Sequence, residues 1–132
     1  MTILLVDDSR FLRTANERAL AKAGYNVITA ADGEEGLRLA SERRPDLVIL
    51  DLMLPKLSGV ELLRALRKDP ATAETPIMIL SSLPQRNESK LVSEGATAYF
   101  EKSMLESSQG TQPFLSAVAD LLRSTKRKAA TK

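Results

Sequence analysis

Short apolar runs alternate along the chain with segments in which apolar residues recur at helical spacing. The runs predict strands at about residues 2–6, 25–29, 47–50, 76–80 and 97–100. The intervening segments predict helices at about residues 9–23, 33–43, 59–68, 85–94 and 113–126. Because strands and helices alternate, the pattern indicates an α/β fold in which helices cover both faces of a parallel sheet.

The first and last predicted helices have recognisable ends. Ser9 is the expected cap of the first helix, and Gly24 follows its last turn. Pro113 lies near the start of the last helix, where its missing N–H does no harm. Residues 103–112, rich in Ser, Gln and Gly, predict a long connection before that helix.

Length and composition predict one domain, because 132 residues with 43% hydrophobic residues form a single core. The chain has no cysteine and no histidine. Disulfides, thiolate catalysis and imidazole chemistry are therefore excluded. The apolar runs are far shorter than the roughly 20 residues of a membrane span, and the chain has no signal-peptide pattern, so a cytoplasmic protein without a membrane span is expected.

The charge is distributed unevenly, although the formal net charge is only +2. Five positive charges follow Asp120 without an acidic residue among them: Arg123, Lys126, Arg127, Lys128 and Lys132. Subtracting these five from the net charge leaves −3 for the rest of the chain. We therefore predict a domain at residues 1–126 and a basic tail or linker stub at 127–132, and nucleic-acid binding by the domain alone is not expected.

Acidic residues end two of the predicted strands. Asp7 and Asp8 follow the first apolar run, and Asp51 follows the third. The carboxyl ends of parallel strands meet at one edge of a sheet, so three carboxylates would lie together there. Their mutual repulsion requires a proton or a cation, and Mg²⁺ suits carboxylates that leave room for water and a phosphate oxygen.

Two further polar residues belong to the same edge. Ser81 ends the fourth predicted strand, and Lys102 follows the fifth. In a doubly wound sheet, ligands bind beyond the carboxyl ends of the strands. Each residue alone has an ordinary explanation as a turn former, a cap or a solvated side chain. Together with the three carboxylates, they form a charge-balanced set suited to a phosphoryl group.

Four short motifs appear in order: Val6-Asp7-Asp8-Ser9, Asp51-Leu52-Met53-Leu54-Pro55 with Gly59, Ser81-Ser82, and Tyr99-Phe100-Glu101-Lys102. In these motifs, and in the successive offsets of 43 residues from Asp8 to Asp51, 30 from Asp51 to Ser81 and 21 from Ser81 to Lys102, the chain resembles the receiver domain of two-component response regulators. The resemblance extends from Ile3 to about Arg123. It implies a flavodoxin-like receiver fold, which is a doubly wound five-stranded parallel sheet in the order 2-1-3-4-5 with five helices.

The resemblance also implies roles for the residues of the site. Asp51 would accept the phosphoryl group. Asp8, Asp51 and the main-chain carbonyl of Met53 would bind Mg²⁺, and Asp7 would contribute through water or by orienting Asp8. Lys102 would pair with Asp51 and later with the phosphoryl group.

A signalling step is implied as well. Ser81 would shift to hydrogen-bond the phosphoryl group, and Tyr99 would turn inward, which changes the face formed by the fourth helix, fifth strand and fifth helix. The implied protein is a switch phosphorylated by a sensor histidine kinase or a histidine phosphotransfer protein, and it controls an effector protein or a linked output domain. It would catalyse its own phosphorylation and dephosphorylation without being a turnover enzyme.

One position departs from the family pattern, because Ser103 follows Lys102 where receivers usually have a proline after a cis bond. The state of that bond stays open. A receiver-like docking module that is not phosphorylated remains the main alternative. A flavodoxin-like cofactor binder is disfavoured because Asp7 and Asp8 would repel a phosphate unless a metal intervened. A metal-dependent phosphatase is also disfavoured, because the nucleophilic aspartate of such an enzyme should lie on the first strand and a cap that covers the substrate is missing.

Overall fold

The structure, a computed structural model, describes residues 1–52, 54, 56–81, 92–102 and 112–130, with side chains as far as residue 123 in the last range. The strands are β1 (Thr2–Val6), β2 (Asn26–Ala30), β3 (Leu47–Asp51), β4 (Ile77–Ser81) and β5 (Ala98–Glu101). Within these ranges, the main helices are α1 (Arg10–Lys22), α2 (Gly33–Arg43), α3 (Gly59–Lys68) and α5 (Gln112–Ala130).

The predicted strands are confirmed to within one residue at each end, and so are three of the helices. The last helix begins as predicted but continues four residues beyond the expected end at residue 126. Most of the helix expected at residues 85–94 lies outside the described residues, as does most of the connection at 103–112. In the part of the chain that the structure describes, no helix combines the length and hydrophobicity that spanning a bilayer requires.

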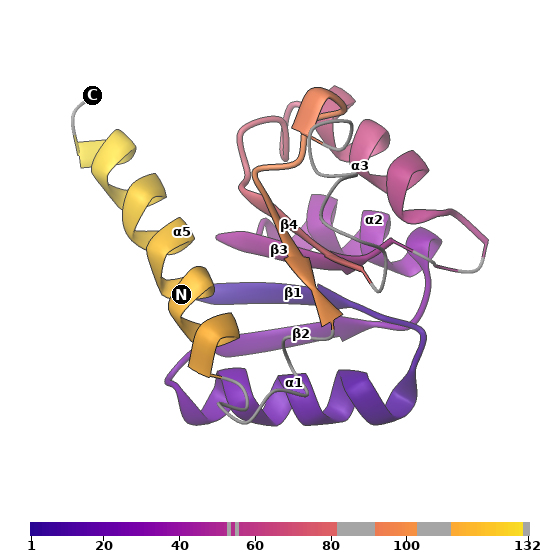
Figure 1. Ribbon diagram of the computed structural model, residues 1–132. Coiled ribbons are helices and arrows are strands. Elements are labelled where there is room, and N and C mark those ends of the chain that lie inside the picture. Colours follow the sequence, from indigo (N-terminus) through magenta and orange to yellow (C-terminus); the bar gives the residue numbers. More distant parts are fainter. Residues whose placement is uncertain (53, 55, 82–91, 103–111, 131–132) are drawn as a thin grey trace.

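The five strands form one parallel sheet in the order β2-β1-β3-β4-β5, as predicted (Figure 1). Val6 is paired in register with Leu50, and Asp51 with Leu80. The strands therefore end nearly level with one another. This register brings the residues that follow β1, β3, β4 and β5 to the same edge of the sheet, which we call the carboxyl edge.

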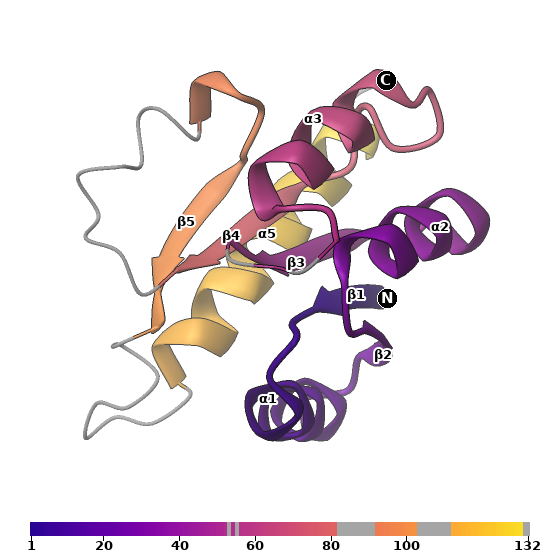
Figure 2. The ribbon, with the colours of Figure 1, turned by 90° about the vertical axis from the view of Figure 1, so that its right-hand side faces the viewer.

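Alternate residues of each strand face two separate cores, so nearly every strand position is apolar. On one face, α2 and α3 contribute the buried residues Ala40, Leu62, Leu63 and Leu66. On the other face, α1 and α5 contribute Leu20, Phe114, Val118 and Leu122. Figure 2 shows α2 and α3 grouped on one side of the sheet, with α1 across from them. The sheet is thus a rigid middle layer whose carboxyl edge carries the polar residues.

Side-chain caps fix where the helices begin after each strand. The Ser9 hydroxyl accepts a hydrogen bond from the Leu12 N–H at 3.3 Å and caps α1, directly after the two acidic residues. Ser58 and Glu61 form a capping box at the start of α3. Each cap satisfies N–H groups that have no partner inside the helix, so the turns at the carboxyl edge have defined conformations.

The loop between β3 and α3 packs tightly against the start of α2. A Cβ atom on Gly33 would lie 2.1 Å from the main-chain oxygen of Leu57, and one on Gly59 would lie 2.7 Å from that of Asp51. The Lys56 ammonium also lies 3.5 Å from Asp32, the residue that caps α2. The loop that follows Asp51 is therefore held by contacts with two helices.

Gly33→Ala is expected to lower the free energy of unfolding by about 1–3 kcal/mol, because the added methyl group overlaps main-chain atoms that cannot rotate away. Urea unfolding measures this change. Glu34→Ala is the matched control, since this exposed neighbour in the same helix makes no such approach. Equal stability of Gly33→Ala and the parent chain would show that the loop moves freely.

At the opposite edge of the sheet, where β4 and β5 begin, Arg67 of α3 hydrogen-bonds several loop residues. Its guanidinium donates to the carbonyl oxygens of Thr72 (3.2 Å), Ala73 (3.0 Å), Thr75 (2.6 Å) and Gly95 (2.9 Å). It also donates to the Thr97 hydroxyl oxygen, which accepts the Ile77 N–H at 3.0 Å. Burial lowers the pKa of Arg67. One side chain thus links α3 to the segments that precede β4 and β5.

Candidate functional site

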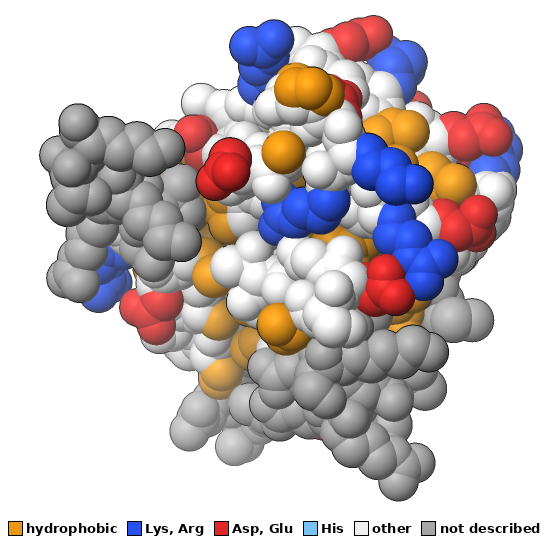
Figure 3. Space-filling view, turned by 90° about the horizontal axis from the view of Figure 1, so that it is seen from above, with side chains coloured by type: hydrophobic (Ala, Val, Ile, Leu, Met, Phe, Trp, Pro, Cys, Tyr) orange, Lys and Arg blue, Asp and Glu red, His pale blue; other side chains and the backbone are white. Residues whose placement is uncertain are grey.

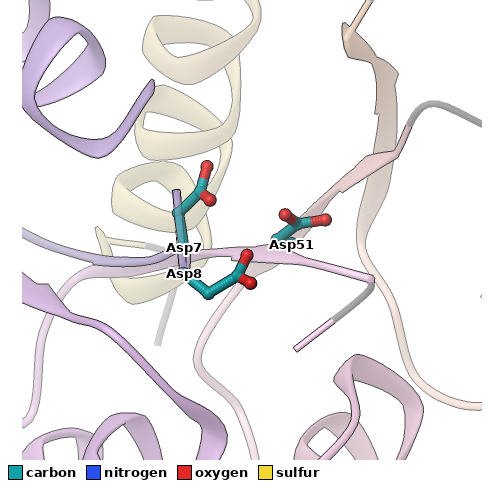
Figure 4. A group of neighbouring side chains, drawn as sticks. All are labelled: Asp7, Asp8 and Asp51. Carbon is teal, nitrogen blue, oxygen red and sulfur yellow. The ribbon is translucent and has the colours of Figure 1, made fainter. Parts of the chain in front are cut away.

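The three acidic residues predicted to form a cluster do so. Asp7 and Asp8 follow β1 directly, and Asp51 is the last residue of β3 (Figure 4). One carboxylate oxygen from each lies within 4.8 Å of the others. Asp7 is fully buried and Asp51 is 4% exposed, whereas Asp8 is exposed to solvent. The sheet therefore presents one accessible and two buried carboxylates at its carboxyl edge, and we call this group the acidic pocket.

Lys102 lies beside the acidic pocket. Its ammonium is 2.6 Å from an Asp51 carboxylate oxygen, and the two side chains are 21% and 6% exposed. Because solvent screens it less, the Coulombic attraction within this pair is stronger than in a pair on the surface. The lysine therefore offsets part of the negative charge of the pocket and marks which oxygen of Asp51 faces a cation.

The predicted switch residues lie on the neighbouring strands. Ser81 is buried at the end of β4, at the same edge as Asp51. Tyr99 of β5 is 8% exposed and packs in the core on the α2 and α3 side of the sheet. The tyrosine side chain is thus already inside in this structure. Met53 lies outside the described residues, so its carbonyl as a metal ligand stays a prediction.

Asp7 has a buried carboxylate oxygen that lacks a hydrogen-bond partner among the described residues. One carboxylate oxygen accepts the Ser9 N–H at 2.9 Å, whereas the other is buried and has no hydrogen-bond partner among the described residues. Burial raises the pKa of Asp7, and Asp51 and Asp8 add to the shift, while the Ser9 N–H and Lys102 oppose it. The ionised form of Asp7 therefore disfavours folding at neutral pH. A proton taken up as the pH falls, or a bound cation, would remove this cost.

The acidic pocket fits a divalent metal ion. It offers oxygen donors only, which suit Mg²⁺, and the spacing of up to 4.8 Å is close to the roughly 4 Å between opposite ligands of an octahedral Mg²⁺ site. The oxygen of Asp7 that has no hydrogen-bond partner among the described residues is a further sign that the pocket can accept a cation in addition to Lys102. Asp8, being exposed, leaves a path for water and for a phosphate oxygen.

The sequence pattern assigned no role to one residue beside the pocket, Arg13. Its guanidinium donates to the main-chain oxygen of Asp7 at 2.8 Å. The only signal in the sequence is its position four residues after the cap Ser9, which places both on the same face of α1. Many helices have an arginine at such a position, so spacing alone does not single it out.

A parallel sheet in the order 2-1-3-4-5, with an acidic pocket and a paired lysine at its carboxyl edge, defines a receiver of two-component signalling. The chain belongs to the response regulator receiver domain family, whose family model matches residues 3–109. Its acidic pocket is typical of receivers that accept a phosphoryl group.

Comparisons with individual proteins agree with this family. The chain is 42% identical to the alkaline phosphatase synthesis transcriptional regulatory protein PhoP of Bacillus subtilis over 76% of its own length and 41% of the relative. The structure resembles the chemotaxis response regulator CheY4 of Vibrio cholerae, with a TM-score of 0.81, 30% identity and coverage of 91% of this chain and 97% of the other.

A Francisella response regulator receiver domain superposes with a TM-score of 0.84 at 27% identity, covering 94% of this chain and 98% of that domain. By contrast, the chain spans half or less of the length of the first curated relatives. It therefore corresponds to the receiver portion of such proteins, and their other activities are not transferred to it.

Proposed function

We propose that this domain is a phosphorylation-activated switch that accepts a phosphoryl group on Asp51 in an Mg²⁺-dependent reaction. The observation that supports this most directly is the contact between Asp51 and Lys102 at 2.6 Å, next to the carboxylates of Asp7 and Asp8. A nucleophile, a cation to neutralise charge and a candidate metal site are thus grouped at one accessible edge.

In the proposed reaction, an Asp51 oxygen forms a bond to phosphorus while the P–N bond of a phosphohistidine donor breaks. The leaving imidazole nitrogen keeps the bonding electron pair. Asp8, Asp51 and the Met53 carbonyl would hold Mg²⁺, with Asp7 acting through water, and the bound ion would neutralise charge on the transferring group. Lys102 would move with the phosphoryl group, because its ammonium already contacts the acceptor oxygen.

In the proposed signalling step, phosphorylation of Asp51 changes the contacts of Ser81 and stabilises one position of Tyr99. Ser81 would donate its hydroxyl hydrogen to the phosphoryl group from the end of β4. Since Tyr99 is already buried, the proposal is that phosphorylation stabilises this inward position rather than creating it. The output surface would be the face formed by the predicted fourth helix, by β5 and by α5.

The proposed partners are a sensor histidine kinase or a histidine phosphotransfer protein upstream, in the cytoplasm, and an effector protein or linked output domain downstream. The relative PhoP is a transcriptional regulator by name, but the face in Figure 3 shows positive and negative side chains interspersed among the described residues. This mixture is consistent with an output other than direct nucleic-acid binding by the receiver. The limits of 1–126 for the domain and 127–132 for a tail remain predictions, and α5 continues to Ala130.

The proposal is tested by incubating the chain with Mg²⁺ and acetyl phosphate and measuring its intact mass. The expected result is a gain of one phosphoryl group. No gain is expected when a chelator has removed the metal before acetyl phosphate is added. No gain in the presence of Mg²⁺ would contradict the proposal and favour a docking module that acts without phosphorylation.

A surface for the donor protein lies beside the site on α1. Phe11 is 80% exposed, and an apolar hollow next to it is lined in part by Thr14 and Ala15. A protein that delivers a phosphoryl group to Asp51 has to approach the carboxyl edge, where α1 begins. Exposed aromatic side chains at such positions often contribute strongly to binding.

Phe11→Ala is therefore expected to slow phosphotransfer from a phosphohistidine protein by about tenfold at subsaturating concentration. The rate with acetyl phosphate should not change, because this small donor makes no contact with the helix. Val92→Ala, which alters another exposed apolar residue, is the control. An equal loss with both donors would show that Phe11 supports the site and not a partner.

A further inference from the structure

The two main-chain polar groups of Asp7, its N–H and its carbonyl, are both hydrogen-bonded. The N–H of Asp7 donates to the carbonyl oxygen of Ala30 at 3.0 Å, which extends the pairing with β2 by one residue. The carbonyl oxygen of Asp7 accepts a hydrogen bond from the guanidinium of Arg13 at 2.8 Å. Because Asp7 is fully buried, this carbonyl has no ready alternative in solvent. Arg13 therefore supplies the donor that a neighbouring strand supplies elsewhere in the sheet.

The same short turn is closed by three further bonds. The Ser9 N–H donates to the Asp7 carboxylate at 2.9 Å, the Leu12 N–H donates to the Ser9 hydroxyl oxygen at 3.3 Å, and the Arg13 N–H donates to the Ser9 carbonyl at 2.8 Å. These bonds tie Ser9 to the helix and to the Asp7 side chain. The Arg13 side chain adds a link from α1 to the main chain of Asp7 itself. Asp8 lies between these two fixed residues, so the direction of its side chain depends on both.

We propose that Arg13 is a positioning residue of the acidic pocket: by fixing the peptide after Asp7, it holds the carboxylates of Asp7 and Asp8 in the arrangement that binds a divalent cation. The inference rests on the proposed function only in taking the pocket to be a Mg²⁺ site. Arg13 contacts a carbonyl and not a carboxylate, so its contribution is orientation of the ligands and not neutralisation of their charge.

The direction in which Arg13→Ala changes the Mg²⁺ affinity distinguishes a role in orienting the ligands from a purely electrostatic role. Removing a positive charge close to a cation site reduces repulsion of the incoming ion, so electrostatics alone predicts tighter binding of Mg²⁺ by Arg13→Ala. Removing a hydrogen bond that orients a metal ligand weakens binding, commonly by tenfold or more. Arg10 provides the matched control, because it is exposed, lies closer in sequence to Asp8, and its side chain makes no hydrogen bond or ion pair within the described residues.

The experiment is a Mg²⁺ titration of the full chain followed by amide NMR shifts around Asp7 and Asp51, with urea unfolding of each metal-free variant to measure stability separately. We expect Arg13→Ala to weaken Mg²⁺ binding about tenfold and Arg13→Lys to lie between it and the parent, since lysine keeps a donor without the planar fork. Arg10→Ala should bind Mg²⁺ as tightly as the parent or more tightly.

Binding by Arg13→Ala that equals or exceeds that of the parent overturns the inference, and so does an equal loss in Arg10→Ala. If Arg13→Ala does not fold, Arg13→Met decides the question, because it keeps an aliphatic side chain of similar length without a donor, and unchanged Mg²⁺ affinity in that variant excludes a positioning role. Failure of the parent chain to bind Mg²⁺ overturns the proposed metal site as well, which distinguishes the two failures.

Discussion

Asp51→Asn is expected to abolish the incorporation of a phosphoryl group from acetyl phosphate. The amide that replaces the carboxylate is uncharged and a poor nucleophile, and it removes the negative charge that pairs with Lys102. We do not expect the remaining acids to take its place, since the ion pair with Lys102 is made by Asp51. Intact mass after incubation with Mg²⁺ and acetyl phosphate measures the effect.

The control for this prediction is Asp120→Asn, which removes an exposed carboxylate on α5 that pairs across the helix surface with Arg123. This variant should gain the phosphoryl group at the rate of the parent chain. A full mass gain in Asp51→Asn would show that another residue is the acceptor, and peptide mapping would then identify it.

Lys102→Ala is expected to have two effects of different origin. Without metal, it should lower the free energy of unfolding by about 3 kcal/mol, because removing one partner of a shielded ion pair leaves Asp51 buried without its cation. With Mg²⁺, phosphorylation should slow by about 100-fold, as is typical when a group that stabilises developing charge is removed.

The diagnostic result is the response of Lys102→Ala to metal. Because Mg²⁺ and Lys102 neutralise the same carboxylates, saturating Mg²⁺ should stabilise Lys102→Ala more than it stabilises the parent. Urea unfolding with and without Mg²⁺ measures this difference, with Lys68→Ala as the control at a position outside the pocket, on the last turn of α3. Equal stabilisation of both chains would mean that the lysine acts by packing and not by neutralising charge.

Most of the fold was predictable because buried parallel strands leave a plain signal. Ile3 to Val6 and Leu47 to Leu50 are apolar at consecutive positions, since each strand faces a core on both sides. The end of α5 was not predictable from charge. Arg127 and Lys128 were assigned to a basic tail, yet lysine, arginine and alanine favour helices, and basic residues are favourable near a helix C-terminus.

The acidic pocket and Lys102 were predictable for a different reason, since residues at the carboxyl ends of parallel strands have to meet at one edge. Their burial was not, because the exposure of Asp8 and the burial of its neighbour Asp7 depend on how α1 packs. The position of Tyr99 was also undetermined, since alternation along an edge strand does not decide which side a ring occupies. The role of Met53 remains a prediction, and the cis or trans state of the bond before Ser103 stays open, because both residues lie outside the described part of the chain.

The hydrogen bonds of Arg67 have a mechanical consequence for β5. They anchor the segment that leads into this strand, through Gly95 and Thr97, to α3 and to the start of β4. The other end of β5 leads to Lys102, whose partner changes if Asp51 gains a charged group. Because the beginning of β5 is anchored, a shift of Lys102 would act mainly on the end of the strand at the carboxyl edge, and the pairing with β4 would keep its register.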